Sequence, residues 1–302
     1  MTLKAGKKVG PYTIEALVGR GEAGEVYLAR DGRRRRFAAL KVLSPDIAAQ
    51  PRQFAQLQRE ARTGALLNHP NIATVFDVGC DEGVPYVVSE LLRGRTLRAR
   101  MGRGPLAPRV AVRLGRQIAS GLAAAHDAGV AHRDLKPENV FIAAWDRVKI
   151  VDFGSAKCWF EALELLQAED ASSGGLVGYM SPEQVRGGEG DHRSDIFSLG
   201  AMLYEMLSGT APFRRRTTIE TLNAVLNDEP LPLDVSGKIG RDLARIVRRC
   251  LAKDPAERYQ SARDVEKDLE AACPSSRETA GTLLGAHVLR PLSLLTTVMR
   301  LF

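Results

Sequence analysis

The sequence His-Arg-Asp-Leu-Lys-Pro-Glu-Asn occupies residues 132–139 of this 302-residue chain and does most to decide its predicted fold. Asp134 can accept the proton of an attacking hydroxyl group, because a carboxylate within hydrogen-bond reach acts as a general base. Lys136 can neutralise negative charge that develops on a reacting group, and the amide oxygen of Asn139 can hold a divalent cation. His132 follows two apolar residues, so we expect it to be buried and structural.

A glycine-rich stretch lies upstream: Gly19-Arg-Gly21-Glu-Ala-Gly24-Glu-Val26. Glycine lets backbone N–H groups come close to phosphate oxygens, where a side chain would clash. A dinucleotide-binding loop of this pattern needs a helix directly after it, whereas residues 25–29 alternate like a strand. A Walker A loop is excluded because no Gly-Lys-Ser/Thr follows. The stretch therefore predicts a phosphate-binding loop of another kind.

Two charged residues lie in an apolar strand or directly after one. Lys41 lies inside one, which is costly unless its charge is paired. Either its ammonium group reaches solvent at a sheet edge, or it binds phosphate and is held by Glu60, on a helix expected over residues 53–67. Asp152 begins Asp-Phe-Gly directly after the strand 148–151, and a carboxylate at a strand end suits Mg²⁺, which takes one or two carboxylates plus phosphate oxygens.

The two parts of the chain differ in their hydrophobic periodicity. Strand patterns dominate the first third, over residues 12–43, 72–78 and 85–91. Helical patterns dominate beyond Gly94, over residues 110–126, 194–208, 219–226, 239–251 and 262–272, with short strands at 140–142 and 148–151. A β-rich first third before a mostly helical remainder indicates two lobes rather than one doubly wound sheet.

The four motifs, in this order, resemble the signature set of the protein kinase family, and the resemblance covers residues 9–272. It implies an α+β, bilobal kinase fold. A small β-rich N-lobe (residues 1–92) would bind the nucleotide, and a larger, mostly helical C-lobe (residues 93–272) would carry catalysis and substrate binding. Residues 273–302 would form a C-terminal tail of unknown role.

The resemblance also implies the role of each site residue. Catalytic roles fall to Asp134, Lys136, Lys41 and Glu60, and metal binding falls to Asn139 and Asp152. The nucleotide would be held by Gly19, Gly21, Gly24, Val26, Lys41 and backbone groups of Glu90 and Leu92, with Ser89 as a small gatekeeper. The implied cofactors are ATP and Mg²⁺, with Mn²⁺ as an alternative, and the implied partners are protein substrates.

Further positions indicate which class of protein kinase the chain resembles. Ser181-Pro-Glu183 stands where the family usually has Ala-Pro-Glu, and Arg258 resembles a late arginine that pairs with Glu183. Both favour protein substrates over small molecules, and Asp195 resembles a helix aspartate of the family. Lys-Pro-Glu-Asn (136–139) is similar to the serine/threonine class, and residues 178–184 look like bacterial members.

Two features between Asp152 and Glu183 depart from the family pattern. The separation of 31 residues is long, and residues 159–166 carry an apolar face at helical spacing, so this segment is either an ordinary insertion or an inhibitory plug. Leu176 stands where the family has a threonine that hydrogen-bonds the catalytic Asp and Lys, which leucine cannot do. We expect an active serine/threonine kinase in signalling, the alternative being a pseudokinase that acts as a nucleotide-binding scaffold or regulator.

The same segment contains no threonine between residues 153 and 180. Arg133 implies a phosphate on this segment in active relatives, and Ser172 or Ser173 can carry it. Alternatively, acidic side chains of the segment can pair with Arg133 without phosphorylation; these are Glu161, Glu164, Glu169 and Asp170.

The composition argues against other partners and locations. The net charge is +7, but aromatic residues make up only 6% and do not interleave with the basic ones, so a stacking platform for nucleic acid is not expected. The densest basic run, residues 33–36, is expected to be a solvated turn rather than a docking patch. Four widely spaced cysteines suggest neither a zinc site nor disulfides, and we expect a cytoplasmic protein.

The two ends of the chain carry no clear targeting signal. Residues 1–10 lack the apolar core of a signal peptide. Residues 283–302 are fairly apolar but contain His287, Arg290 and Arg300, whereas a membrane span wants about twenty apolar residues. We therefore expect a tail that packs on a surface or stays mobile rather than a membrane contact.

Overall fold

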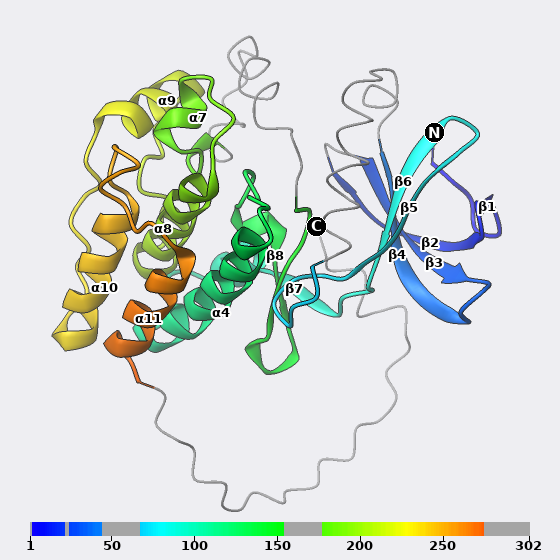
Figure 1. Ribbon diagram of the computed structural model, residues 1–302, viewed down its shortest axis with the longest axis horizontal. Coiled ribbons are helices and arrows are strands. Elements are labelled where there is room, and N and C mark those ends of the chain that lie inside the picture. The colour runs from blue at the N-terminus through cyan, green and yellow to red at the C-terminus, as the bar shows by residue number, and fades with distance from the viewer. Residues whose placement is uncertain (1, 22–23, 44–66, 154–176, 275–302) are drawn as a thin grey trace, which may run out of the picture.

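The N-terminal lobe is a six-stranded antiparallel sheet, at the right of Figure 1. The computed structural model describes residues 2–21, 24–43, 67–153 and 177–274. In the sheet order β1-β2-β3-β4-β6-β5, the strands are β1 (Lys8–Val9), β2 (Tyr12–Gly21), β3 (Gly24–Asp31), β4 (Arg36–Leu43), β6 (Val84–Ser89) and β5 (Val75–Asp81).

Alternation along β3 and β4 builds the core of this lobe. Tyr27 and Ala29 of β3, with Ala38 and Leu40 of β4, are fully buried, while Val26 is half-buried on the opposite face. Side chains two residues apart share a face of a sheet, so the period-two pattern in the sequence translates directly into this core. The predicted alternation of residues 25–29 is confirmed.

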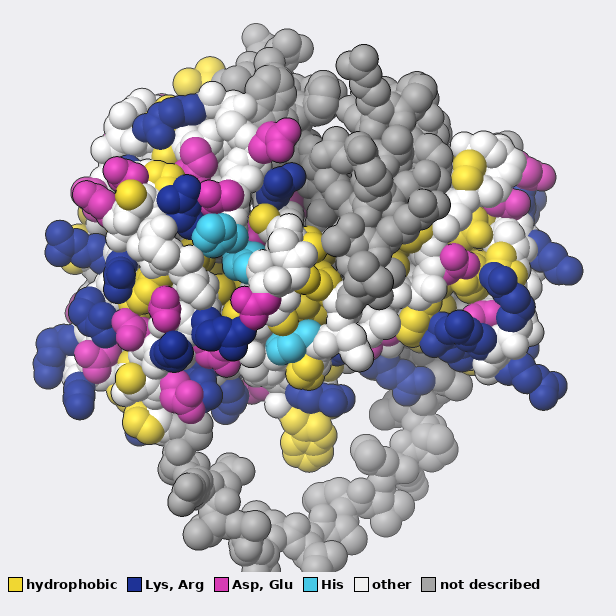
Figure 2. Space-filling model, in the orientation of Figure 1, with side chains coloured by type: hydrophobic (Ala, Val, Ile, Leu, Met, Phe, Trp, Pro, Cys, Tyr) yellow, Lys and Arg dark blue, Asp and Glu magenta, His cyan; other side chains and the backbone are white. Residues whose placement is uncertain are grey.

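The basic run of residues 33–36 forms the turn between β3 and β4. The buried carboxylate of Asp31 holds this turn, because its Oδ1 accepts hydrogen bonds from the backbone N–H groups of Arg33 and Arg34. Arg36 pairs with the same Asp31, and Arg33 lies 3.6 Å from Asp77. In Figure 2, acidic side chains lie among the basic ones over much of the visible face. A solvated turn, as predicted, accounts for the run.

Helices form most of the second lobe, at the left of Figure 1. They are α3 (Leu97–Met101), α4 (Pro108–Asp127), α7 (Pro182–Val185), α8 (His192–Ser208), α9 (Thr218–Asn227), α10 (Gly237–Cys250) and α11 (Ala262–Ala272). A small sheet accompanies them, made of β7 (Gly94–Thr96), β8 (Val140–Ala143) and β9 (Val148–Ile150). The single-turn elements η1 (Pro137–Asn139) and η2 (Ala144–Asp146) flank β8.

Helix α8 is the centre of this lobe. Of its 17 residues, 14 are buried, because α4 and α10 pack against it. A helix that is buried all round must satisfy its polar side chains internally, and Asp195 and Ser198 of α8 do so with loops that reach the candidate site. The packing of α8 therefore positions those loops.

The predicted elements are largely confirmed. All five helices predicted beyond Gly94 are present, and α11 has the predicted bounds, where the Ser261 hydroxyl caps its first turn. The strand predicted over residues 72–78 starts only at Val75, because Ile72 pairs with Ile150 of the other lobe instead. The helix expected over residues 53–67 lies outside the described residues, except for Leu67. Among the described helices, none is long and apolar enough to span a membrane.

Candidate active site

The loop before η1 is held in place by a buried carboxylate. Asp195 of α8, which is fully buried, accepts hydrogen bonds from the backbone N–H groups of His132 and Arg133, each at 2.7 Å. His126 Nε2 lies 2.8 Å from the same carboxylate. Arg133 has a φ of 66°, a backbone conformation that costs a residue other than glycine about 1–3 kcal/mol. Hydrogen bonds to a charged acceptor offset that cost.

His132 joins this loop to the Asp-Phe-Gly segment. Its side chain is fully buried, its Nε2 lies 2.9 Å from the backbone oxygen of Val151, and its ring lies 4.7 Å from that of Phe153. Every polar contact of this ring serves the backbone, so the predicted structural role of His132 is confirmed. The contacts of His132 therefore fix the position of this loop relative to the segment that carries Asp152.

Three predicted site residues meet where this loop runs into η1. The ammonium group of Lys136 lies 3.1 Å from Asp134 Oδ1. Asn139 Nδ2 donates to the backbone oxygen of Asp134 at 2.8 Å and to its Oδ2 at 3.0 Å. These two donors fix the Asp134 carboxylate, which borders a small pocket together with Lys136, Tyr179 and Met180.

Lys41 reaches across from the other lobe. Its ammonium group in β4 donates to Asp152 Oδ2 at 2.8 Å. Desolvation opposes ionisation of Asp152, but the charge and the hydrogen bond of Lys41 outweigh it and hold the pKa of this carboxyl below its ordinary value. The partner that the sequence suggested for Lys41, Glu60, lies outside the described residues, so the described contact of Lys41 is with Asp152.

The β2–β3 hairpin aligns the glycine stretch with Lys41. Gly19 pairs with Val26, and Val26 pairs in turn with Lys41 on the next strand. Gly21 pairs with Gly24, where a side-chain Cβ would lie only 1.9 Å from a backbone oxygen of β4. A strand follows the glycines, as predicted, and a helix does not. The hairpin therefore places the glycine stretch beside the strand that carries Lys41.

The junction of the lobes carries the residues predicted to meet adenine. The backbone N–H of Glu90 donates to the oxygen of Thr74, and the Glu90 carboxylate accepts from Lys149 at 2.7 Å. The Glu90 carbonyl and the backbone of Leu92 remain the groups that we expect a purine edge to meet. Ser89 ends β6, paired with Ala39.

The donor set at the site fits a magnesium nucleotide. Asp152 and Asn139 supply a carboxylate and an amide oxygen, the hard donors that Mg²⁺ and Mn²⁺ prefer. Because Asn139 uses Nδ2 for Asp134, its Oδ1 is the atom able to ligate a cation. Lys41 adds a positive charge next to Asp152, suited to phosphate oxygens.

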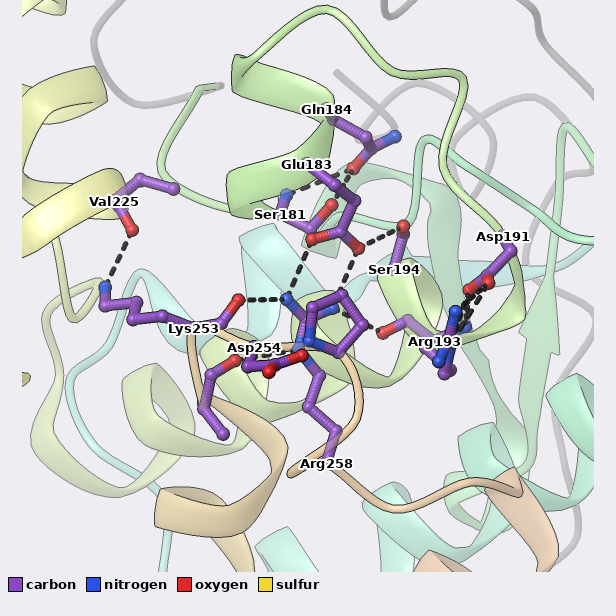
Figure 3. Close-up of polar contacts among 12 residues, drawn as sticks. Ser181, Glu183, Gln184, Asp191, Arg193, Ser194, Val225, Lys253, Asp254 and Arg258 are labelled. Atoms are coloured by element: carbon purple, nitrogen blue, oxygen red, sulfur yellow. Dashed lines mark hydrogen bonds and ion pairs between the residues drawn. The ribbon is translucent and has the colours of Figure 1, made fainter.

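A second ion pair anchors the segment after the site. Both terminal nitrogens of Arg258 donate to the carboxylate of Glu183, each at 2.8 Å, and Ser194 adds a hydroxyl donor (Figure 3). This confirms the predicted pairing of Arg258 with Glu183. The neighbouring Gln184 donates to the backbone oxygen of Arg133 at 2.7 Å. The anchored segment thereby contacts the loop that carries Asp134.

Two pairings were missed by the sequence reasoning. Lys149 stands inside an apolar strand, the same signal that singled out Lys41, and its ammonium group pairs with Glu90 and with the backbone oxygen of Ile72. Arg98 of α3 contacts Glu138, Tyr179 and Glu205, and nothing in its local sequence marks it. The predictions for the apolar stretch 159–166, Ser172, Ser173 and Leu176 concern residues outside the described ones.

Comparisons with known proteins agree with this geometry. The family model for the protein kinase domain matches residues 12–268. Serine/threonine-protein kinase PknB of Mycobacterium leprae (strain TN) is 38% identical over 264 residues, which are 85% of this chain and 42% of that protein. PknD of Mycobacterium tuberculosis (strain ATCC 25618 / H37Rv) is 37% identical over 284 residues, 93% of this chain and again 42% of that protein.

A solved structure gives the same result for the fold. The crystal structure of the Mycobacterium tuberculosis PknI kinase domain has a TM-score of 0.72 and 26% identity, covering 90% of this chain and 100% of that one. The chain spans less than half the length of the curated relatives it matches. The match over residues 12–268 and these relatives show that the chain belongs to the protein kinase family.

Proposed function

We propose that this chain is a serine/threonine protein kinase that transfers the γ-phosphate of ATP to hydroxyl groups of protein substrates. Two neighbouring groups of residues carry the proposal. Asp134 contacts Lys136 and Asn139, and Asp152 pairs with Lys41. The groups adjoin because the backbone N–H of Val151, the residue before Asp152, donates to the carbonyl of Asn139 at 2.9 Å. The relatives named above are called serine/threonine-protein kinases, which supports the same class. We place the boundary between the lobes at residues 92 and 93, just before β7 begins at Gly94 and pairs with β8.

The residues of the chain would divide the work of phosphoryl transfer. Such a reaction needs in-line positioning and charge neutralisation more than covalent chemistry. Asp134 would accept a hydrogen bond from the acceptor hydroxyl and take its proton, and Lys136, 3.1 Å away, would neutralise charge on the transferring group. Positioning of this kind is worth roughly 7–11 kcal/mol of barrier.

Asp152 and Asn139 would hold the metal ion, and Lys41 with the β2–β3 hairpin would hold the phosphates. An ion held by these two residues would offset negative charge on the phosphates. Mg²⁺ is the proposed ion and Mn²⁺ the alternative, to be separated by titrating each into the assay. ATP and reduced thiols both belong to the cytoplasm, where we place the catalytic domain.

The test is transfer of labelled phosphate from ATP to a generic protein substrate. Wild type should transfer, and Asp134→Asn should lose about 10²–10⁴-fold in rate, the usual contribution of a general base. Asp127→Asn is the matched control, because Asp127 is an exposed aspartate at the end of α4. Full turnover by Asp134→Asn would refute the assignment of the base.

The same assay tests the pseudokinase alternative. Leu176→Thr restores the hydroxyl that the family pattern has at this position. Silence of wild type together with transfer by Leu176→Thr would show that the natural chain does not turn over. Transfer by wild type would instead show that Leu176 is compatible with catalysis.

A further inference from the structure

An arginine beside the candidate site joins helix α3 to η1, to α8 and to the turn before α7. Arg98 of α3 donates through Nε to Glu138 Oε1 at 2.7 Å and through Nη1 to Glu205 Oε1 at 2.6 Å. Its Nη2 donates to the hydroxyl of Tyr179 at 2.6 Å, and that hydroxyl donates to the other oxygen of Glu205. We call Arg98, Glu138, Tyr179 and Glu205 the Arg98 cluster.

The Arg98 cluster adjoins the place where an acceptor hydroxyl would lie. Glu138 belongs to η1, between Lys136 and Asn139. Tyr179 lines the same small pocket as Asp134 and Lys136. A side chain of a bound peptide that flanks the acceptor is therefore within reach of this cluster.

The Arg98 cluster is buried on one side and exposed to solvent on the other. Tyr179 and Glu205 are buried, with 2% and 6% of their surface exposed. The side chains of Arg98 and Glu138 keep 38% and 36% of theirs. The open side is thus formed by the guanidinium group and the Glu138 carboxylate, the groups that a peptide would meet first.

The charges of the Arg98 cluster define what it would attract. Burial, and next the charge of Glu205, raise the pKa of Tyr179, so its phenol is neutral at neutral pH. Two carboxylates and one guanidinium then leave a single negative charge. Without the guanidinium the cluster would hold two carboxylates beside the acceptor site, and these would favour an arginine or lysine of the peptide by charge and by planar hydrogen bonding.

We propose that Arg98 is a specificity-determining residue, because its guanidinium group fills the acidic cluster of Glu138 and Glu205 from within the chain. A basic side chain of the substrate meets a site that is already occupied. The chain therefore shows little preference for basic residues around the acceptor. This inference rests on the proposed kinase function and adds a statement about its substrates.

A merely structural role for Arg98 makes a different prediction. If Arg98 only ties α3 to η1 and α8, its removal lowers stability and turnover for every peptide alike. If Arg98 sets specificity, its removal changes the ratio between basic and neutral peptides. That ratio is the decisive quantity, because a uniform loss of activity cancels in it.

The experiment uses the full chain and serine peptides with arginine or alanine at each of the three positions on either side of the acceptor. For each pair, kcat/KM is measured for wild type and Arg98→Ala, and peptide binding is measured separately by fluorescence anisotropy. Wild type should give ratios within about twofold, and Arg98→Ala should raise the ratio at least about tenfold at one or two positions, or 1.4 kcal/mol. The gain should shrink at high salt.

Two variants make the test specific. Adding Glu138→Gln to Arg98→Ala should bring the ratio back toward the wild-type value, because one of the two carboxylates is then neutral. Arg100→Ala, on the same short helix, is the control and should leave all ratios unchanged. Arg98→Met, which keeps most of the side-chain length, takes the place of Arg98→Ala if the alanine variant fails to fold.

The outcomes separate this inference from the proposed function. Unchanged ratios in Arg98→Ala and in Arg98→Met overturn it, and so does a wild-type ratio that already exceeds about tenfold. If wild type transfers no phosphate, the proposed function fails. The anisotropy ratios then still support or overturn the role of Arg98, since they need no turnover.

Discussion

Two ion pairs, one that anchors the segment after the candidate site and one within the site, differ in their exposure to solvent and in the number of hydrogen bonds they make. Arg258 has no exposed surface in its side chain, and it donates to both oxygens of Glu183 and to three backbone oxygens. Lys41 and Asp152 share one described hydrogen bond, with 23% and 39% of their side chains exposed. The first pair is enclosed by protein, and the second lies where a ligand can reach it.

This difference separates charges that maintain the fold from charges that would serve catalysis. A buried charge needs all its hydrogen bonds, so the loss of one partner is expensive. A partly exposed pair is worth little to stability, because water screens it. Lys41 and Asp152 can therefore exchange each other for phosphate and metal at small cost, whereas Arg258 and Glu183 cannot exchange partners.

Arg258→Met should have the largest effect on stability. It leaves the Glu183 carboxylate half-buried without its bidentate partner, and we expect the free energy of unfolding to fall by about 3–5 kcal/mol. Urea denaturation followed by circular dichroism measures this loss. The double variant Arg258→Met/Glu183→Gln should regain part of it, because no charge is then left unpaired. A loss below about 1 kcal/mol in the single variant would mean that the two ion pairs contribute similarly to stability.

Lys41→Met should lower activity strongly and change stability little. We expect the transfer rate to fall by about 10²–10³-fold, the cost of removing one charge-stabilising group. The free energy of unfolding should change by less than about 1 kcal/mol, because the pair is partly exposed. Rate assays at saturating ATP and urea denaturation of the same preparation measure the two quantities. Unfolding of the variant, or an unchanged rate, would contradict the distinction.

Much of this contrast can be predicted from the sequence. The pairing of Arg258 with Glu183 and the grouping of Asp134, Lys136 and Asn139 follow from short motifs, because the family's geometry comes with them. The buried role of His132 follows from its apolar neighbours. The first residue of α11 follows from Ser261, since a side-chain cap at a helix start is a local signal.

Contacts that join distant parts of the chain could not be predicted in this way. The described partner of Lys41 is 111 positions away, and local periodicity says nothing of such a pair. Arg98 lies in a five-residue helix with one other basic residue, Arg100, a pattern typical of a solvated surface. Only the folding of α3 against η1 and α8 turns that residue into a bridge.

Lys149 offers an intermediate case between the two pairs. Its ammonium group bonds Glu90 and the backbone oxygen of Ile72, with 20% and 26% of the two charged side chains exposed. We expect Lys149→Met to lower the free energy of unfolding by about 1.5–2 kcal/mol, because bonds to charged groups are lost at a partly buried place. The KM for ATP should rise while kcat changes less, since Glu90 lies at the lobe junction. Unchanged stability with unchanged KM would contradict this placement.

The smallest expected effect concerns Lys253, next to Arg258 in Figure 3. Burial, with a smaller contribution from the charge of Arg258, lowers the pKa of Lys253 from its ordinary 10.5 to about 8. Between these values the unfolded chain holds the proton that the folded chain has released, so stability rises with pH across this range. After allowance for solvent screening, we expect a rise of about 1 kcal/mol.

Comparison with Lys253→Met isolates the contribution of Lys253 titration to stability, because every other group titrates alike in both proteins. The difference in unfolding free energy, wild type minus variant, should grow between pH 7.5 and 9.5. The neutral amine still donates to the backbone oxygens of Ala224 and Val225, so deprotonation removes the cost of burying a charge and keeps the hydrogen bonds. A difference that stays constant or shrinks with pH would mean that Lys253 remains charged beside Arg258. The enclosed region would then hold two positive charges, and burial alone would not decide the charge state of its side chains.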